Sequence, residues 1–263
     1  MGGLLLINPR SGNDSPSAEE LVAAAEARGI ETHVMAEGED LVEIARSAEA
    51  DKLGRAGGDG SLAPVAGVAL ERDLRFVCIP FGTRNHFARD LGLGRDDPVG
   101  ALDSFDGVER RIDVGRANEQ LFLNNISLGL YARLVHRREH HRRRREALAR
   151  MRTWAIVLTH RAPLGITIDD EPVETRLVLV ANNGYAFELP SIGERERLDE
   201  GKLHLYVPGG EPAERVGESF AVDAAAGRLE AAIDGEPAVL ETPIEFRIEP
   251  LALRVLVPPA DGG

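Results

Sequence analysis

Short apolar runs alternate with amphipathic stretches over the first hundred residues, and this alternation predicts strands and helices in turn. The predicted elements, in chain order, are a strand at 4–7, a helix at 17–28, a strand at 31–35, a helix at 40–48, a strand at 51–56, a helix at 61–71, a strand at 75–79 and a helical stretch ending at 91. Segment 51–56 is a poor strand by composition, and only its position predicts one. The alternation is typical of an α/β fold, a parallel sheet with helices on both faces.

After about residue 106 the pattern changes to short apolar strands bounded by Gly, Pro, Asp or Asn. The predicted strands are 112–115 and 121–123, which form a hairpin, and then 166–168, 177–181, 203–207, 220–222, 229–233, 244–248 and 253–257. This spacing favours a β-sandwich, interrupted by one helical insertion. We therefore predict two domains, an α/β domain at 1–106 and a β-sandwich domain at 107–263.

The composition is that of an ordinary globular protein, with 43% hydrophobic and 29% charged residues among 263. A formal net charge of −13 argues against nucleic acid as a partner. The single cysteine, Cys78, lies in an apolar run and predicts a buried packing residue in a reducing compartment. The sequence shows neither a signal peptide nor an apolar run near the ~20 residues that span a bilayer. We expect a cytoplasmic protein, attached at most peripherally to the inner membrane leaflet.

A glycine-rich loop, Gly57-Gly58-Asp59-Gly60-Ser61, opens directly into the helix predicted at 61–71. Glycines let a ligand approach the main chain, and the free N–H groups of a helix start suit a phosphate. Because phosphate repels a carboxylate, Asp59 points to Mg²⁺-nucleotide chemistry. The alternative is a strand-to-helix turn in which Asp59 and Ser61 cap the helix.

Two further polar loops follow predicted strands, at 8–12 and at 82–85. Ligands of open α/β sheets bind at the carboxyl ends of the strands. We therefore expect these two loops and the loop at 57–61 to converge on one crevice.

The stretch from His136 to Arg152 contains eight arginines and three histidines in an otherwise acidic chain. An apolar run follows it at 154–158. A basic segment beside apolar residues can dock on an anionic leaflet, at ~1 kcal/mol per basic residue. The alternative is a solvated helix face.

The order and spacing of these motifs resemble the diacylglycerol kinase catalytic-domain family, which includes soluble bacterial lipid kinases and the sphingosine kinases. The motifs that carry the resemblance are 8–12, 57–61, 82–92, 113–115, 122–125, 127–129, 198–203 and 234–236. The resemblance implies an ATP-binding α/β domain, a β-sandwich lipid-substrate domain, ATP and Mg²⁺ as cofactors, and a reaction in the cleft between the domains.

Carried over by position, the resemblance also implies roles for single residues. The residues expected to hold the nucleotide are Asn8, Pro9, Arg10, Ser11, Gly12, Gly57, Gly58, Asp59, Gly60, Ser61, Leu62, Ala63, Gly82, Thr83 and Asn85. Asp59 would act through water on the catalytic Mg²⁺, and Glu236, with Asp234 beside it, would deprotonate the lipid hydroxyl. Glu200 would hold a structural Mg²⁺, helped by the main-chain oxygens of Arg197 and Lys202.

The chain departs from the family pattern at His86, where an aspartate is usual after Asn85. The leading hypothesis is an ATP- and Mg²⁺-dependent kinase acting on the primary hydroxyl of diacylglycerol or a related lipid, with an anionic membrane surface as partner. One alternative is a kinase of a soluble substrate, as in NAD kinase. Another is a lipid- or nucleotide-sensing module that has lost catalysis. The oligomeric state stays open, a homodimer being one option.

Overall fold

The structure is a computed structural model that describes residues 2–11, 16–129, 163–186 and 193–259. The chain divides into two compact units. The first is Met1–Val114, Tyr185–Gly201 and Glu249–Gly263, and the second is Gly115–Gly184 and Lys202–Ile248. The units thus do not follow a single boundary near residue 106, because two later segments belong to the first unit.

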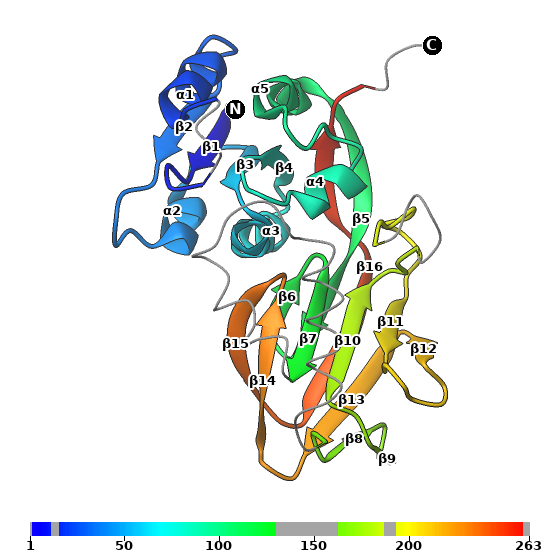
Figure 1. The fold of residues 1–263 in the computed structure, drawn as a ribbon. Helices are drawn as coiled ribbons and strands as arrows, with labels where there is room; N and C mark the ends of the chain where they lie inside the picture. Colours follow the sequence, from blue (N-terminus) through cyan, green and yellow to red (C-terminus); the bar gives the residue numbers. More distant parts are fainter. Residues whose placement is uncertain (1, 12–15, 130–162, 187–192, 260–263) are drawn as a thin grey trace, which may run out of the picture. The chain divides into compact units, whose positions relative to one another are not determined.

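The first unit is an α/β fold (Figure 1). Its strands are β1 (Gly3–Ile7), β2 (Glu31–Val34), β3 (Lys52–Gly57), β4 (Arg75–Pro80), the first part of β5 (Val108–Ala117) and the end of β16 (Ile244–Val257). Its helices are α1 (Ala18–Glu26), α2 (Leu41–Ser47), the 3₁₀ turn η1 (Asp59–Ser61), α3 (Leu62–Glu71), α4 (His86–Asp90), α5 (Pro98–Ala101) and the 3₁₀ turn η2 (Leu102–Asp106). The order β2-β1-β3-β4-β16 is parallel throughout.

Local sequence signals explain the first elements. Ser17 and Glu20 form the expected capping box at the start of α1, and Gly29, with a φ of +71°, follows its end. Asp40 caps α2, since its carboxylate accepts the N–H groups of Val42 at 2.9 Å and Glu43 at 3.2 Å. The spacing of Ser17 and Glu20 predicts such a box, and this prediction is confirmed. The helix at 40–48 was predicted without its cap, which the structure assigns to Asp40.

Helices cover both faces of the parallel sheet, as predicted. On one face α1, α5 and η2 pack over Leu5, Ile7 and Val77. Helix α3 packs on β3 and β4, and α2 packs on α3. Strand β3, predicted by position alone, owes its poor composition partly to Gly54, where a Cβ atom would meet the ring of Phe105 at 2.5 Å.

The second unit consists of two antiparallel layers. One is the six-stranded sheet β12-β11-β10-β7-β14-β15, and the other runs from the first part of β16 through β13 to β8 and β9. The bounds are β6 (Gln120–Phe122), β7 (Asn125–Gly129), β8 (Ile166–Ile168), β9 (Glu171–Val173), β10 (Leu177–Asn182), β11 (Leu203–Tyr206), β12 (Glu214–Gly217), β13 (Ser219–Ala224), β14 (Arg228–Ile233) and β15 (Glu236–Glu241). The end of β5 and β6 form the predicted hairpin.

The core of this unit lies between the two layers. Alternate residues of β13 (Phe220, Val222 and Ala224) and of β7 (Ile126 and Leu128) are buried in it. This two-residue period is the signature of half-buried strands in a β-sandwich, so the predicted fold class is confirmed. The predicted helical insertion lies outside the described residues.

The last two predicted strands, 244–248 and 253–257, are a single strand, β16, so the predicted break between them is wrong. The break was expected at Pro250, which is exposed. Leu251 has a φ of +52°, and its N–H donates to the Asp113 carboxylate at 2.8 Å. A side chain therefore takes the place of a ladder partner at this irregular point, and the strand continues.

Among the described residues, no helix is both long and apolar enough to cross a membrane.

Candidate active site

The three polar loops of the first unit meet at one edge of its sheet. The parallel register aligns Ile7 of β1 with Ala56 of β3, and Gly57 with Pro80 of β4, so the loops after these strands start side by side. The loop after β4 touches the loop after β3, since a Cβ atom on Gly82 would lie 2.5 Å from the Cα atom of Gly58. The loops therefore start at one edge of the sheet, as predicted, and Gly82 permits the close contact between two of them. The shared crevice stays a prediction.

The turn after β1 is held by its own asparagine. The Asn8 Oδ1 atom accepts the Arg10 N–H at 3.0 Å, and the Asn8 carbonyl accepts the Ser11 N–H at 3.1 Å. Pro9 and Arg10 are exposed, and Arg10 pairs with Glu37 at 2.8 Å. Gly12, the fifth residue predicted here, lies outside the described residues.

Backbone N–H groups are available in the loop after β3. Among the described residues, the N–H groups of Gly58, Asp59 and Gly60 have no acceptor, whereas the Ser61 N–H bonds the Gly58 carbonyl at 2.9 Å. Consecutive free N–H groups before a helix form an anion-binding concavity, and the α3 dipole adds positive potential. Leu62 and Ala63 are buried in the first turn of α3, so a ligand at this loop would contact their main-chain atoms and not their side chains.

Asp59 caps a helix, but not the one that follows it in sequence. Its Oδ2 atom accepts the His86 N–H at 3.2 Å and its Oδ1 atom accepts the Phe87 N–H at 3.0 Å. Both donors belong to the first turn of α4, where a carboxylate also complements the helix dipole. Each carboxylate oxygen keeps a second lone pair for another partner.

Asn85 organises the loop after β4. Its Oδ1 atom accepts the Gly82 N–H at 2.9 Å, and its Nδ2 atom donates to the carbonyls of Gly82 at 3.0 Å and Arg95 at 2.8 Å. The residue is buried and has a left-handed φ of +50°. Its amide is thus engaged within the loop, and the exposed members of the loop are Thr83 and Arg84.

The surroundings of His86 lower the pKa of its imidazole. Burial lowers its pKa, the nearby Asp59 raises it, and the cationic Arg89, Arg95 and Arg84 lower it further, so that the net shift is downward from 6.5. Four charged groups therefore act on this imidazole, and three of them are positive.

This shift predicts a pH effect on stability. The unfolded histidine takes up a proton near pH 6.5, whereas folded His86 resists it, so its contribution is complete above that pH and is lost as the pH falls. We expect His86→Gln, which does not titrate, to unfold with a flatter pH dependence below about pH 6.5. Urea midpoints between about pH 7.5 and 5.5 in nucleotide-free buffer measure this effect. An unchanged slope would contradict it.

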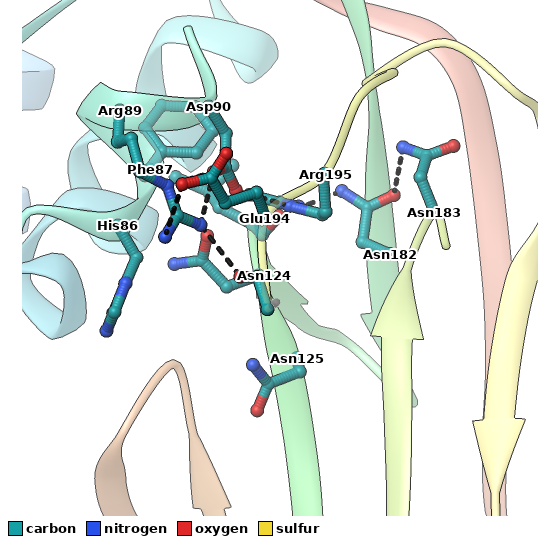
Figure 2. Close-up of polar contacts among 12 residues, drawn as sticks. His86, Phe87, Arg89, Asp90, Asn124, Asn125, Asn182, Asn183, Glu194 and Arg195 are labelled. Carbon is teal, nitrogen blue, oxygen red and sulfur yellow. Dashed lines mark hydrogen bonds and ion pairs between the residues drawn. The ribbon is translucent and has the colours of Figure 1, made fainter. Parts of the chain in front are cut away.

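A buried ion-pair cluster fixes the far end of α4. The Asp90 carboxylate accepts from Arg89 Nη2 at 2.6 Å and from Arg195 Nε at 2.8 Å, and Arg89 also donates to the Gly193 carbonyl at 2.7 Å (Figure 2). The side chains of Asp90 and Arg195 are 1% and 0% exposed. The sequence did not predict Arg195 as a partner of α4.

The predicted acidic pair of the second unit follows β14. The buried Asp234 carboxylate accepts three backbone N–H groups, those of Leu123 at 2.8 Å, Asn124 at 2.7 Å and Asn125 at 3.1 Å. Glu236, the first residue of β15, is exposed. The two acids therefore have different surroundings, one enclosed by amides and the other in contact with solvent.

Buried asparagines lie beside Asp234. The Asn182 Nδ2 atom donates to the Leu123 carbonyl at 3.0 Å, and Asn183 donates to Asn182 at 3.2 Å (Figure 2). The N–H of Asn182 bonds the carbonyl of Asn124 at 3.0 Å. These hydrogen bonds hold the turn before β7 in place.

The predicted structural metal site centres on Glu200, whose loop is held by a buried aspartate. The buried Asp113 carboxylate accepts the Gly201 N–H at 2.6 Å and thereby fixes the loop next to Glu200. The Arg197 side chain pairs with Asp199 at 2.9 Å, and the Lys202 carbonyl accepts the Asn183 N–H at 3.1 Å. In the described part of the chain, no group of three or more His, Cys, Asp or Glu side chains could hold a metal ion. The site stays a prediction.

Arg55 is the residue of this site that the sequence analysis missed. It lies on β3, two residues before Gly57, and is only 3% exposed. Its Nε atom donates to the Ser61 Oγ atom at 3.2 Å, and that hydroxyl donates to the Gly58 carbonyl at 2.9 Å. One signal for it was present in the sequence: an arginine lies inside segment 51–56, which was predicted to be a strand of the parallel sheet.

The chain resembles known kinases. The family model described as "Diacylglycerol kinase catalytic domain" matches residues 3–117. A "Diacylglycerol kinase" of Bacillus subtilis is 34% identical over 142 residues, and one of Staphylococcus saprophyticus is 35% identical over 130. These matches cover 50% and 46% of this chain but only 47% and 42% of the relatives, less than half of their length.

Solved structures share the fold over almost the whole chain. A structure described as one of the diacylglycerol kinases from Bacillus anthracis superposes with a TM-score of 0.69 at 19% identity, covering 98% of this chain and 97% of that one. A second structure from the same organism gives a TM-score of 0.72 at 21% identity, with 99% and 98% covered. At this identity the likeness establishes the fold of both units.

Proposed function

We propose that the protein is an ATP- and Mg²⁺-dependent kinase of a membrane lipid, because residues 3–117 match the family model described as "Diacylglycerol kinase catalytic domain". Its acceptor is the primary hydroxyl of diacylglycerol or a related lipid. The observation that carries the proposal is the anion-binding chemistry within the matched segment, where three free N–H groups and a buried guanidinium meet at one loop. Binding at the cytoplasmic face of the membrane is part of the same proposal.

The first unit holds the nucleotide. The N–H groups of Gly58, Asp59 and Gly60 bind phosphate oxygens, and the turn that starts at Asn8 borders the same loop. Thr83 offers an exposed hydroxyl from the third loop. Phosphoryl transfer depends on such positioning and on charge neutralisation more than on covalent help.

Asp59 suits a role at the metal. Its two hydrogen bonds to α4 orient the carboxylate and leave lone pairs for a metal-bound water. A carboxylate beside a phosphate site is favourable only where a cation lies between them, so the donor set fits Mg²⁺. When bound, Mg²⁺ neutralises the charge on the phosphate oxygens and polarises the transferred group.

Glu236 suits the role of general base. It is an exposed carboxylate on the first residue of β15 and is able to take the proton of an acceptor hydroxyl. Asp234 has three N–H donors on its carboxylate and therefore acts as a positioning residue for the turn that leads to Glu236. The role assigned to each acid thus follows from its exposure.

The decisive experiment is product identification. Pure protein is incubated with γ-labelled ATP, Mg²⁺ and mixed vesicles that contain diacylglycerol, ceramide and phosphatidylglycerol, and the labelled product is extracted and identified. Label in phosphatidic acid or another lipid phosphate supports the proposal. Label only in a water-soluble product, with NAD added to the mixture, supports the soluble-substrate alternative. ATP binding without any transfer supports a sensing module.

Asp59→Asn tests the metal role. Asparagine keeps one acceptor for the α4 amides but cannot carry the negative charge, so we expect kcat to fall about 100-fold or more. Steady-state rates on diacylglycerol vesicles over a range of Mg²⁺ concentrations measure the effect. Asp106→Asn, which removes an exposed charge paired with Lys52, is the control. A kcat equal to that of the control would remove Asp59 from the mechanism.

Membrane docking by the stretch from His136 to Arg152 stays a prediction, since these residues lie outside the described part of the chain. Sedimentation with vesicles with and without phosphatidylglycerol tests it.

A further inference from the structure

The first unit buries an arginine, Arg55, that has no acidic partner among the described residues. Arg55 is 3% exposed, and among the described residues its guanidinium reaches only the Ser61 Oγ atom and, from Nη1, the Leu6 carbonyl at 3.4 Å. Both acceptors are neutral. A guanidinium carries five N–H donors, so several donors of this group find no acceptor in the described part of the chain.

Burial without a counter-charge is unfavourable, and its effect is visible in the protonation equilibrium. Loss of hydration lowers the pKa of Arg55 to about 10, with no carboxylate to oppose the shift. Buried charges in proteins are normally paired. Arg195, equally buried in the same unit, is paired with Asp90. Arg55 therefore stands apart from the other buried arginine, and its counter-charge must come from outside the described chain.

The position of the guanidinium indicates where that charge binds. A Cβ atom on Gly57 would collide with the Ser61 Oγ atom and lie 3.3 Å from the Arg55 Nε atom, so the guanidinium is directly beneath the turn that begins at Gly57. The same turn presents the free N–H groups of Gly58, Asp59 and Gly60. Two independent sources of positive potential, one from the main chain and one from a buried side chain, are thus directed at one loop.

We propose that Arg55 is a positioning residue for a polyphosphate: it holds the Ser61 hydroxyl in place, and its buried positive charge is neutralised by the phosphate groups that bind the Gly58–Ser61 loop. This inference rests on the nucleotide site of the proposed function. The positive side-chain charge that faces the phosphates thus comes from β3, the strand beneath the loop, and not from a residue of the loop.

A purely structural role makes the opposite prediction. If Arg55 only braced Ser61 against β1, its replacement would lower the stability of the ligand-free protein and leave anion affinity largely unchanged. If its charge serves the anion, an apolar residue of similar size relieves the desolvation in the ligand-free protein and weakens anion binding.

The test compares Arg55→Met, Arg55→Lys and the control Arg46→Met, which removes an exposed arginine paired with Glu71. The probe is inorganic tripolyphosphate without Mg²⁺, followed by calorimetric titration and by thermal unfolding. We expect Arg55→Met to raise the Kd about 10- to 100-fold and to abolish most of the tripolyphosphate-induced rise in Tm. Arg55→Lys is expected to bind with intermediate affinity, because lysine keeps the positive charge but lacks the planar set of donors of a guanidinium. Arg46→Met is expected to bind as the unmodified protein does.

Two further readouts separate charge from packing. Without tripolyphosphate, the Tm of Arg55→Met is expected to equal or exceed that of the unmodified protein. The dependence of Kd on NaCl concentration is expected to be shallower in Arg55→Met, because one fixed charge is missing. A ligand-free Tm lowered by more than about 5 °C, with a Kd within two-fold of the control, would overturn the inference.

The outcomes also distinguish this inference from the proposed function. In one outcome, Arg55→Met loses tripolyphosphate binding and the unmodified protein phosphorylates no lipid. This outcome upholds the inference and overturns the lipid kinase assignment. Lipid phosphorylation with an ATP KM that is unchanged in Arg55→Met overturns the inference alone. An increased ATP KM with an unchanged KM for the lipid supports both.

Discussion

Glu236→Gln is expected to lower kcat for lipid phosphorylation by about 10²- to 10⁴-fold, the usual contribution of a positioned general base. Glutamine keeps the length and hydrogen-bonding atoms of the side chain but cannot accept the hydroxyl proton. Because Glu236 is exposed on the first residue of β15, we expect the fold to be unchanged in this variant. Initial rates on diacylglycerol vesicles at saturating ATP measure it.

Glu241→Gln is the matched control for this experiment. Glu241 is the last residue of the same strand and is also exposed, so it tests the loss of a carboxylate on β15 at a position without a proposed role. We expect its kcat to stay within about two-fold of that of the unmodified protein, because substitutions at exposed positions usually have small effects. Equal rates for the two variants would show that another group takes the hydroxyl proton.

Asp90→Ala is expected to lower the free energy of unfolding by about 3–5 kcal/mol, the usual effect of breaking a buried ion pair. The carboxylate binds two arginines, one of which has a fully buried side chain, and its removal leaves positive charge concentrated at the end of α4. Urea unfolding followed by circular dichroism measures the loss. Asp90→Asn, which keeps one acceptor oxygen, is expected to lose less.

The control for Asp90 is an ion pair of the same chemistry on the surface. Asp103 pairs with Arg28 at 2.9 Å, with side chains 60% and 34% exposed. Because water screens such a pair, Asp103→Ala is expected to change stability by less than about 1 kcal/mol. Similar losses for Asp90→Ala and Asp103→Ala would mean that the buried cluster contributes no more than a surface pair.

The elements that depend on local signals were predictable from the sequence. The capping box of Ser17 and Glu20, the cap at Asp40 and the polar loops after β1, β3 and β4 all follow from residues a few positions apart. Because parallel strands end at one edge of a sheet, the convergence of these loops also followed from topology.

The features that depend on distant contacts were not predictable. Asp90 and Arg195 are 105 positions apart, and Asp113 bonds Leu251 across 138 positions. No periodicity reports such pairs, so the segment 185–201 was assigned to the second domain although it belongs to the first unit. The same limit explains the wrong break in β16, where the partner that permits the irregular residue lies far away in the sequence.

Residue type alone also did not separate binding from support at the candidate site. Asn85 stays a predicted nucleotide contact, and its amide, engaged by Gly82 and Arg95, also shapes the loop. Asp59 was a candidate cap for its own helix, and it caps α4 instead. Arg55 was not predicted as part of the site, because an arginine inside a strand carries no sequence signal for anion binding.

The long strand β16 has a consequence for synthesis on the ribosome. Residues 255 and 256 pair with β4, so the sheet of the first unit lacks one of its strands until these residues have emerged, about 175 positions after β4 itself. Until then β4 presents an unprotected edge, which invites pairing with other nascent chains. A fragment that stops at residue 117 carries the three loops proposed to bind phosphate, yet it omits this closing strand and is expected to aggregate.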